Sequence, residues 1–575
     1  MIIRHILLLS IIGLLVSCSN STTKEDLPVK TICNPVDLSY RFSLNDSPWR
    51  EAADPSIIKF NGEYFLFLSK SGGYFHSTDL ISWNLISTED LPIEDYAPTV
   101  EEIDGEVYFT TSMGTNRVYK SSDPKSAKWE LVTDKFPFVL ADPMIFYDRE
   151  HSRLYLYYGS GAGTPLMGME LDKKTFMPKG DAVSLFYSNR EKYGWEVDGD
   201  YNDNYKKIPW LEGAWVNKHN GKYYLQYSNP GTQYKSYNDA VYTSDNPLGP
   251  FVVAKHNPFA YKPEGFAAGA GHGSTFQDVY GNYWHIGTVT ISVRHMFERR
   301  LSLFPTFFDK DGELYTYTGW GDYPMIIPNK KVNSPDELFS GWMLLSYNKK
   351  IETSSTLERH PDNYAVNEDI RTWWSAKTGE KGEYLSVDLD NISTIHAIQI
   401  NFADQDAKKK NSDDSTYYQY FIEGSINGDD WNTIIDKSNN QIIAPNEYIQ
   451  LDKPVEARYV RITNVYSPSE KFSISGFRIF GKSTKNPPAE VNFSNVIRDE
   501  NNRRTVKLTW DKADNATGYN IRFGADKNKL YHNYIVYDDN KLSVNILNTD
   551  LPYFFSIDSF NEGGITKGKD VKKAL

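Results

Sequence analysis

Cysteine is nearly absent from this 575-residue chain, which contains only Cys18 and Cys33. Because Cys18 falls in an N-terminal signal described below, Cys33 would stand alone in the mature chain, as a small buried or idle thiol without an intramolecular disulfide. Positive charge is also in deficit, since 62 Lys and Arg residues face 75 Asp and Glu residues and give a formal net charge of -13. This balance argues against nucleic acid as a partner and against direct binding to an anionic membrane surface.

A run long enough to span a membrane is missing at the N-terminus. The apolar residues 6–16 follow Arg4 and have the charged start and short core of a signal peptide. The string LLVSC resembles a bacterial lipobox, which implies that Cys18 becomes the lipidated first residue, and an ordinary secretion signal is the alternative. We therefore expect a lipoprotein signal over residues 1–18, a polar tether over residues 19–33, and lipid anchoring in a bacterial cell envelope, at the outer membrane and facing the periplasm or the surface.

Aromatic residues are abundant, at 14% of the chain with 40 tyrosines, and many of them fall in a repeated pattern. Five segments join a turn to an aromatic-rich run, and in four of them the second residue is glycine. The segments are NGEYFLFLSK from Asn61, DGEVYFTTSM from Asp104, HSRLYLYYGS from His151, NGKYYLQYSN from Asn220 and YGNYWHIGTV from Tyr280. Each segment predicts a β-hairpin turn that leads into a strand.

A polar residue lies several positions upstream of each of these strands. In chain order these residues are Asp54, Thr99, Asp142, Glu212 and His272. Five copies of one unit, each with one polar side chain at the same phase, are typical of a radial β repeat whose equivalent strands face a common axis. The sequence therefore predicts an all-β protein with a five-bladed β-propeller over residues 34–329, and these five side chains in its central funnel.

The residues around these positions resemble a known family. The five units begin with EAADPSIIKF, YAPTVEEI, LADPMIFYD, LEGAW and GAGHGSTFQD, in this order along the chain. These motifs resemble the clan of five-bladed propeller glycosidases that contains glycoside hydrolase family 43, and the resemblance covers all five blades. It implies a glycoside hydrolase whose partner is a polysaccharide or an oligosaccharide.

Matched residue by residue, the resemblance implies that Asp54 is the general base and Glu212 the general acid. It implies that Asp142 orients the acid and tunes its pKa. It also implies that His272, at the base of the channel, contacts substrate and in some relatives helps to hold a cation through water. A Ca²⁺ ion in the propeller channel is therefore one expectation, although no cofactor is required.

The second blade departs from the family pattern, since Thr99 stands where an acidic residue is usual and Tyr96 replaces a usual Trp. The three carboxylates still suit inverting hydrolysis, which needs a protonated acid and an ionised base about 6.5–9.5 Å apart. Burial and the charge of Asp142 would raise the pKa of Glu212 and keep it protonated near neutral pH. The alternatives are that each Asp-Pro pair caps a turn and that His272 is a polar core residue.

Aromatic and basic residues complete the predicted substrate site. Four rings are expected to form apolar walls for a sugar, with core packing as the alternative: Trp215, Tyr96, Phe75 and Trp83. Arg300 matches the position of an arginine that often contacts substrate in the family, and Arg299 is an equal candidate on phase alone.

The repeat stops near residue 329. Over residues 330–482, predicted short strands alternate with tight turns, a pattern that indicates a jelly-roll β-sandwich. The motifs DIRTWWSA, GEYLSVDLD and ISGFRIFGK resemble the discoidin-like domain shared by carbohydrate-binding module family 32. The resemblance does not identify a ligand, because the loops of such a domain determine what it binds. The alternative to a binding role is that the domain is a rigid spacer. Asn363, Asp369 and Thr372 lie where relatives often place a structural Ca²⁺, and a solvated polar loop is the competing interpretation.

A third domain follows the proline-punctuated stretch KSTKNPPAEV. The sequence pattern of residues 487–575 predicts about seven short strands, and the length of this range suits one β-sandwich domain. Trp510, Tyr519 and the aromatic run after Pro552 resemble a fibronectin type III domain, whose expected role is spacing or packing.

These features predict an inverting, exo-acting glycosidase that releases terminal sugars, most readily α-L-arabinofuranosyl groups. β-D-Galactofuranoside is second, because its ring has the same stereochemical arrangement, and β-xyloside and exo-β-galactoside cleavage follow. A non-catalytic surface glycan-binding lipoprotein is an alternative, which the intact set of Asp54, Asp142 and Glu212 argues against. A retaining fructan-cleaving enzyme is a third hypothesis, but the chain lacks the Asn-Asp-Pro-Asn-Gly start of those relatives.

Overall fold

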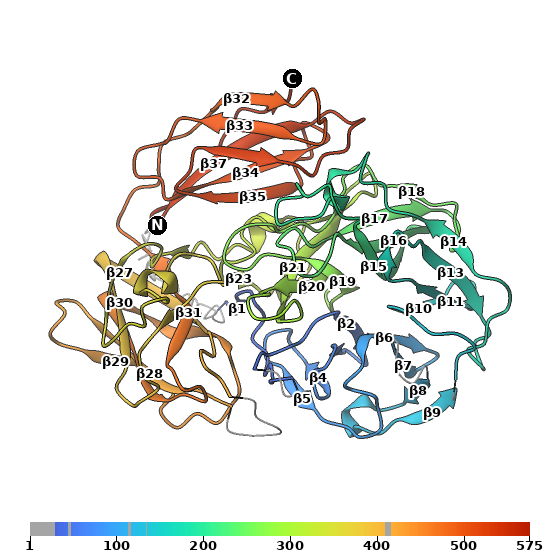
Figure 1. Ribbon diagram of the computed structural model, residues 1–575, viewed down its shortest axis with the longest axis horizontal. Helices are drawn as coiled ribbons and strands as arrows, with labels where there is room; N and C mark the ends of the chain where they lie inside the picture. Colours follow the sequence, from blue (N-terminus) through green and yellow to red (C-terminus); the bar gives the residue numbers. More distant parts are fainter. Residues whose placement is uncertain (1–28, 44–47, 113–116, 134, 409–415) are drawn as a thin grey trace, which may run out of the picture.

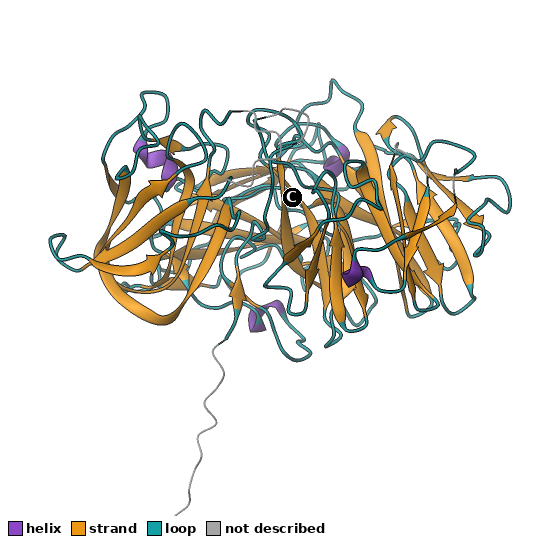
Figure 2. Cartoon of the chain, turned by 90° about the horizontal axis from the view of Figure 1, so that it is seen from below, coloured by secondary structure: helices purple, strands orange, loops and turns teal. Residues whose placement is uncertain are grey.

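The computed structural model describes residues 29–43, 48–112, 117–133, 135–408 and 416–575, which fold into three β domains (Figure 1). Helical structure in these residues is limited to four short 3-10 helices, visible as the few purple segments in Figure 2: η1 (Pro124–Ser126), η2 (Gly194–Glu196), η3 (Pro335–Glu337) and η4 (Asp362–Ala365). Among the described residues, no helix has the length and apolar character needed to cross a membrane. The predicted signal peptide and its lipidation site, Cys18, lie outside the described residues.

Five antiparallel sheets of the described chain surround one axis and form the predicted propeller (Figure 1). Blade 1 contains β2 (Ser56–Phe60), β3 (Glu63–Phe67), β4 (Tyr74–Ser77) and β5 (Asn84–Ile86). Blade 2 contains β6 (Tyr96–Ile103), β7 (Glu106–Ser112), β8 (Val118–Ser121) and β9 (Glu130–Thr133). Blade 3 contains β10 (Met144–Asp148), β11 (Arg153–Tyr158), β13 (Leu166–Leu171) and β14 (Val183–Phe186).

The last two blades follow the same order, from the innermost strand outward. Blade 4 contains β15 (Trp210–His219), β16 (Lys222–Asn229), β17 (Asn238–Ser244) and β18 (Val252–Val253), with β12 (Gly161–Ala162) paired to β15. Blade 5 contains β19 (Gly271–Gln277), β20 (Tyr283–Thr290), β21 (Arg299–Phe308) and β22 (Leu314–Thr316). The predicted five-bladed architecture is therefore confirmed.

The repeated turns form because their residues tolerate a left-handed backbone. In blade 1, Asn61 and Gly62 have φ angles of 50° and 79°, and in blade 4 Asn220 and Gly221 have 50° and 78°. Positive φ at both central residues defines the two-residue turn that matches the twist of antiparallel strands. In blade 1 the turn brings Phe60 opposite Glu63 and so fixes the register of β2 against β3.

Each innermost strand has a left-handed residue either two positions before its start or within its first four residues. The five residues are Asp54 (φ 53°), Ala97 (42°), Asp142 (47°), Gly213 (64°) and His272 (43°). The blade 2 member is Ala97 and the blade 4 member is Gly213, so the prediction that all five polar residues share one phase is wrong for Thr99, and Glu212 precedes the left-handed position by one residue. Thr99 lies two positions further along, buried, and its hydroxyl accepts the N–H of Ile145 in the next blade at 3.2 Å.

Side-chain hydroxyls join neighbouring blades at these left-handed residues. The backbone N–H groups donate as follows: Asp54 to Thr288 (3.2 Å), Ala97 to Ser69 (2.8 Å), Asp142 to Ser112 (3.1 Å) and His272 to Ser228 (2.6 Å). Each acceptor lies near the end of the second strand of the preceding blade. The same bond therefore connects blade 5 to 1, 1 to 2, 2 to 3 and 4 to 5.

The chain enters and leaves the propeller side by side, because β1 (Thr31–Ile32) pairs with β23 (Met325–Ile326). Nearby, Cys33 is a buried free thiol, as predicted, and burial raises its pKa to about 12. The next domain forms one eight-stranded sheet that bends round its own core. Its strands are β24 (Met343–Leu344), β25 (Lys350–Thr353), β26 (Trp374–Ser375), β27 (Tyr384–Phe402), β28 (Gln419–Ser425), β29 (Asn432–Asp436), β30 (Asn446–Tyr466) and β31 (Ser473–Lys482).

Two of the three predicted calcium residues of this second domain, Asp369 and Thr372, already have side-chain partners. The Asp369 carboxylate lies 3.6 Å from Lys235 Nζ of the propeller, and the Thr372 hydroxyl accepts a hydrogen bond from the Asn367 amide at 2.8 Å. A calcium ion beside Asn363, Asp369 and Thr372 stays a prediction.

The third domain is a sandwich of two sheets, drawn in red in Figure 1. One sheet contains β32 (Phe493–Arg498), β33 (Val506–Trp510) and β36 (Lys541–Val544). The other contains β34 (Gly518–Gly524), β35 (His532–Tyr537), β37 (Phe554–Asn561), β38 (Gly564–Thr566) and β39 (Lys572–Lys573). Its likeness to a fibronectin type III domain stays a prediction.

A buried ion pair fastens the propeller to the second domain. The guanidinium of Arg50 donates to Asp404 through Nε at 2.8 Å and Nη2 at 3.1 Å, and the two side chains are 0% and 4% exposed. The other Arg50 donors reach the carbonyl oxygens of Tyr40 and Thr416. All three guanidinium nitrogens of Arg50 therefore have acceptors, and both carboxylate oxygens of Asp404 accept from this planar donor.

We expect Asp404→Asn to destabilise the protein by about 3–5 kcal/mol, because it leaves the Arg50 charge buried without a partner. The matched control is Asp336→Asn, which removes an interdomain ion pair with Lys567 whose side chains are 70% and 63% exposed. Calorimetric unfolding should show a much smaller change for the control. Equal shifts of the two variants would contradict the role given to the buried pair.

Candidate active site

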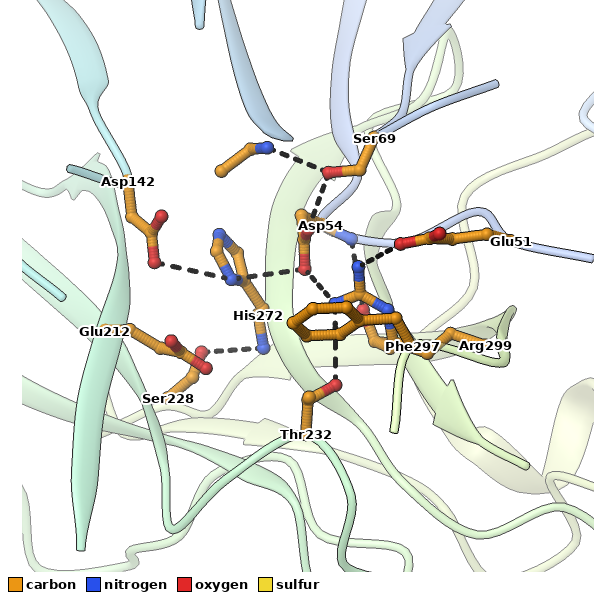
Figure 3. A network of polar contacts seen from close by, with 12 residues as sticks. Glu51, Asp54, Ser69, Asp142, Glu212, Ser228, Thr232, His272, Phe297 and Arg299 are labelled. Carbon is orange, nitrogen blue, oxygen red and sulfur yellow. Dashed lines mark hydrogen bonds and ion pairs between the residues drawn. The ribbon is translucent and has the colours of Figure 1, made fainter. Parts of the chain in front are cut away.

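A cavity of about 740 Å³ lies on the propeller axis, where the innermost strands begin. Five of the predicted site residues line it, and the four that carry the expected acid–base groups each come from a different blade: Asp54, Asp142, Glu212 and His272. Figure 3 shows His272 between Asp54 on one side and Asp142 with Glu212 on the other. Its Nδ1 lies 3.3 Å from Asp54 Oδ1 and 3.9 Å from Asp142 Oδ2. The propeller therefore brings together a cluster of three acidic groups and one imidazole.

Asp54 is held in its ionised form. Its Oδ1 accepts from Arg299 Nη1 at 3.0 Å, and its Oδ2 accepts from the Ser69 hydroxyl at 2.6 Å. Burial acts to raise the pKa of Asp54, but the positive charge of Arg299, the nearby His272 and the Ser69 hydrogen bond together hold it below the ordinary value. Asp54 is thus a carboxylate available to accept a proton near neutral pH.

Glu212 has the opposite electrostatic environment. Burial, and then the charge of Asp142, raise the pKa of Glu212 to about 7. The Tyr237 hydroxyl donates to Oε1 at 2.5 Å and the Ser160 hydroxyl donates to Oε2 at 3.1 Å. A carboxyl group with this pKa still carries a proton near neutral pH and can release it.

Asp142 shares this environment. Burial and the charge of Asp54 raise the pKa of Asp142 to about 7, although the Ser112 hydroxyl donates to its Oδ1 at 3.3 Å. Because Asp142 and Glu212 lie close together in the same buried site, ionising both at once is unfavourable. The pair therefore holds one proton near neutral pH, while Asp54 holds none.

The arginine beside Asp54 is Arg299. Besides Asp54, its guanidinium contacts Glu51 Oε1 at 3.2 Å, and its central carbon lies 4.8 Å from the centre of the Phe297 ring. Arg300, which was expected to contact substrate, points the other way, because successive side chains of β21 alternate in direction. Its Nε donates to Asn446 Oδ1 in the second domain at 2.7 Å, so the prediction for Arg300 is wrong.

Three of the four predicted wall residues lie away from the cavity. Phe75 and Trp83 pack in the core between blades 1 and 5, and the buried Trp215 donates its indole N–H to the Thr275 carbonyl at 3.0 Å. These three predictions are wrong, because the three rings pack between neighbouring blades and not toward the axis. Tyr96 does line the cavity.

The observed walls come from residues that the sequence did not single out. Trp210, Ile208, Met296 and Phe297 give the cavity apolar sides, and Asp198, Lys207, Thr232 and Gln233 add polar groups. Trp210 precedes Glu212 by two residues on β15, and its indole N–H donates to Ser160, the hydroxyl that also contacts Glu212. A period of two along that strand was the signal that could have identified Trp210.

A buried carboxyl with raised pKa and an ionised carboxylate that share one propeller cavity are the pair of groups that glycoside hydrolysis requires. Comparison with known families agrees. Residues 50–314 match the family model for glycosyl hydrolases family 43, and residues 350–475 match the F5/8 type C domain. The chain therefore carries a region that matches family 43 glycosyl hydrolases, followed by a region that matches a discoidin-like domain, and it is a glycoside hydrolase.

Individual relatives have low sequence identity to this chain. A curated β-D-galactofuranosidase, xynD, from Aspergillus niger is 27% identical over 269 residues, which cover 40% of this chain and 72% of the relative. A solved family 43 protein from the xyloglucan locus of Bacteroides ovatus is 14% identical, with a TM-score of 0.41, and covers 95% of this chain and 98% of its own. A thermostable family 43 glycoside hydrolase of known structure is 22% identical, with a TM-score of 0.42, and covers 53% of this chain and all of its own.

Proposed function

We propose that this protein is an inverting exo-glycosidase that releases terminal α-L-arabinofuranosyl groups from a polysaccharide or an oligosaccharide. The observation that carries the proposal is the opposite pKa shift of Asp54 and Glu212, two carboxyl groups that face one cavity. Inverting hydrolysis requires this division, with an ionised base on one side of the sugar and a protonated acid on the other.

In the proposed reaction, Asp54 accepts a proton from a water molecule while the oxygen of that water bonds to the anomeric carbon. Glu212 gives its proton to the glycosidic oxygen as the old bond breaks, and the configuration inverts. Asp142 acts through Glu212, because its charge keeps the acid protonated, and Arg299 acts through Asp54, because its charge keeps the base ionised. No cofactor takes part in these steps.

His272, Asp142 and Glu212 offer one ligand atom each within 4.8 Å of one another and fit a hydrated cation in the channel. When bound, such a Ca²⁺ ion would supply positive charge beside the carboxylates. Arg299 already supplies that charge on the Asp54 side. We therefore propose that any cation at this site is accessory.

Exo action is supported by the dimensions of the site, since a cavity of about 740 Å³ holds a terminal sugar and its neighbours rather than a long stretch of polymer. A second candidate is β-D-galactofuranoside, which the name of the Aspergillus niger relative favours. The two furanosides have the same ring stereochemistry and differ in the exocyclic arm, so one site suits both chemically. β-Xyloside and β-galactoside are less favoured.

Sugar release from aryl α-L-arabinofuranoside, β-D-galactofuranoside, β-D-xyloside and β-D-galactoside tests this proposal. We expect turnover of one furanoside, inverted product in the first NMR spectra, and unchanged rates in the presence of a chelator. Asp54→Asn should lower kcat by about 10²–10⁴-fold. Glu212→Gln should lose less on aryl substrates, whose leaving groups need little protonation, than on an oligosaccharide. Silence across the panel, with polysaccharide binding retained, would instead support a non-catalytic glycan-binding protein.

The pH dependence of kcat/KM tests the assignment of the acid. Activity should fall as pH rises through the pKa of Glu212, about 7, because only the protonated acid is active. Asp142→Asn removes a negative charge and should move this alkaline limb down by about one pH unit, whereas Tyr237→Phe removes a donor to the ionised form and should move it up. Shifts of both variants in the same direction would contradict the assignment.

We also propose that the mature protein is anchored through a lipid on Cys18 in a bacterial cell envelope, at the outer membrane. Support comes from the LLVSC motif and the polar residues that follow it. Cys18→Ser should move the protein from the membrane fraction to the soluble fraction of the producing cells. Retention of that variant in the membrane fraction would contradict lipid anchoring.

A further inference from the structure

A second cavity, of about 720 Å³, lies at the junction of the three domains and is separate from the active site. The propeller contributes Tyr201, Asp203, Lys235 and Glu264, the discoidin-like domain contributes Asn367 and Asp369, and the third domain contributes Tyr534, Asp539, Lys541 and Asn545. Carboxylates, ammonium groups, amides and tyrosines alternate around it. This junction cavity has no role in the reaction proposed above.

The junction cavity and the active-site cavity share a wall made of two short loops. In the first loop Asp198 faces the active site and Tyr201 faces the junction, and in the second loop Gln233 and Lys235 divide in the same way. Asp200 lies between them and accepts hydrogen bonds from the Lys235 N–H at 2.8 Å and from Arg371 Nη1 at 3.0 Å. Only a few residues therefore separate the two cavities.

The wall lies on the leaving-group side of the reaction. Glu212 must contact the glycosidic oxygen, so the rest of the glycan leaves the catalytic centre past this residue. The first loop, which carries Asp198 and Tyr201, continues along the chain to Ile208 and Trp210. These last two residues line the active site beside Glu212 and form the end of this segment. A glycan chain that leaves past Glu212 thus meets this segment first.

Exposed aromatic rings lie along this segment. Tyr187, Tyr201, Tyr205 and Trp210 are all exposed, although large apolar side chains are usually covered. Within the described residues, Asp198 Oδ1 is buried without a hydrogen-bond partner, in a residue that is 4% exposed and lines the active-site cavity. Stacking faces and an unpaired acceptor are the two kinds of group that recognise a sugar ring and its hydroxyls.

The third domain holds the segment rigidly from behind. Gly194 N–H donates to the Leu547 carbonyl at 3.0 Å, Asn545 donates to the Tyr201 carbonyl at 2.8 Å, and Asn502 donates to the Tyr205 hydroxyl at 2.8 Å. A pre-organised surface loses little conformational entropy when a ligand binds. The domain expected to be a spacer therefore supports the wall of the active site.

We propose that the junction cavity, with Tyr201 at its edge, binds the glycan chain on the leaving-group side of the scissile bond. The ligand is a neutral oligosaccharide of several residues, because acidic and basic groups are mixed in the lining and no basic cluster among its described residues selects an anion. This inference rests on the proposed exo-glycosidase function, since it names where the remainder of that substrate lies.

The test compares kcat/KM on branched arabinan oligosaccharides with kcat/KM on the aryl furanoside that the protein cleaves. We expect Tyr201→Ala to lower the ratio of the first to the second by about five-fold, the value of one aromatic contact. Two controls should keep the parent ratio within about two-fold: Tyr201→Phe, which retains the ring, and Tyr280→Ala, which removes an exposed tyrosine from a blade 5 turn. An unchanged ratio in Tyr201→Ala, or an equal loss on both substrates, overturns the inference.

Binding measured without hydrolysis separates this inference from the proposed function. Glu212→Gln protein is titrated by calorimetry with the same arabinan oligosaccharides, with and without Tyr201→Ala. A Kd weakened about five-fold by Tyr201→Ala supports the junction site even if the parent releases no sugar from any substrate. An unchanged Kd together with full hydrolysis by the parent overturns the junction site and leaves the glycosidase function in place.

Discussion

The hydrogen bond from a left-handed backbone N–H to a hydroxyl of the preceding blade determines how this protein presents its chemistry. Asp54, Asp142 and His272 all adopt that backbone, which costs an L-residue about 1–2 kcal/mol, and each is fixed by a serine or threonine from the neighbouring sheet. The bond both closes the ring and turns these side chains toward the axis. The architecture of the propeller and the aim of its functional groups therefore have one physical cause.

The chemistry of the site depends on unequal neighbours for similar carboxyl groups. Asp54 is next to Arg299 and stays ionised, whereas Asp142 and Glu212 are next to each other and hold one proton between them. Burial alone would raise all three pKa values, so the single arginine decides which group is the base. Glu51, which accepts from the other terminal nitrogen of that guanidinium, helps to hold it in position.

The sequence predicted those features that rest on local rules. Turn residues such as Asn61 and Asn220 predicted the hairpins. The repeated position of a polar residue relative to each strand predicted that Asp54, Asp142 and His272 lie near one axis. The phase failed in blade 2, because the left-handed position there is held by the apolar Ala97, so a pattern built on polar residues points to Thr99 instead.

Side-chain direction was harder to predict than backbone phase. Arg299 and Arg300 are equivalent until the first residue of β21 is known, since one position decides which face a strand residue occupies. Phe75, Trp83 and Trp215 have the right chemistry for a sugar wall, but the contacts that bury them come from neighbouring blades. Tyr237, which contacts Glu212, lies in a loop whose path depends on tertiary packing.

The closeness of Gly194 to the third domain limits how this protein can evolve. A side chain there would collide with the Asn545 carbonyl, so two domains that read as independent modules in the sequence meet through their backbones. Accessory domains of this kind are often regarded as interchangeable parts. Here an exchange would bring a foreign surface against residues 187–209, and a recombinant could fold well yet lose its preference among polysaccharides. The lineage is therefore expected to inherit its catalytic and C-terminal domains together.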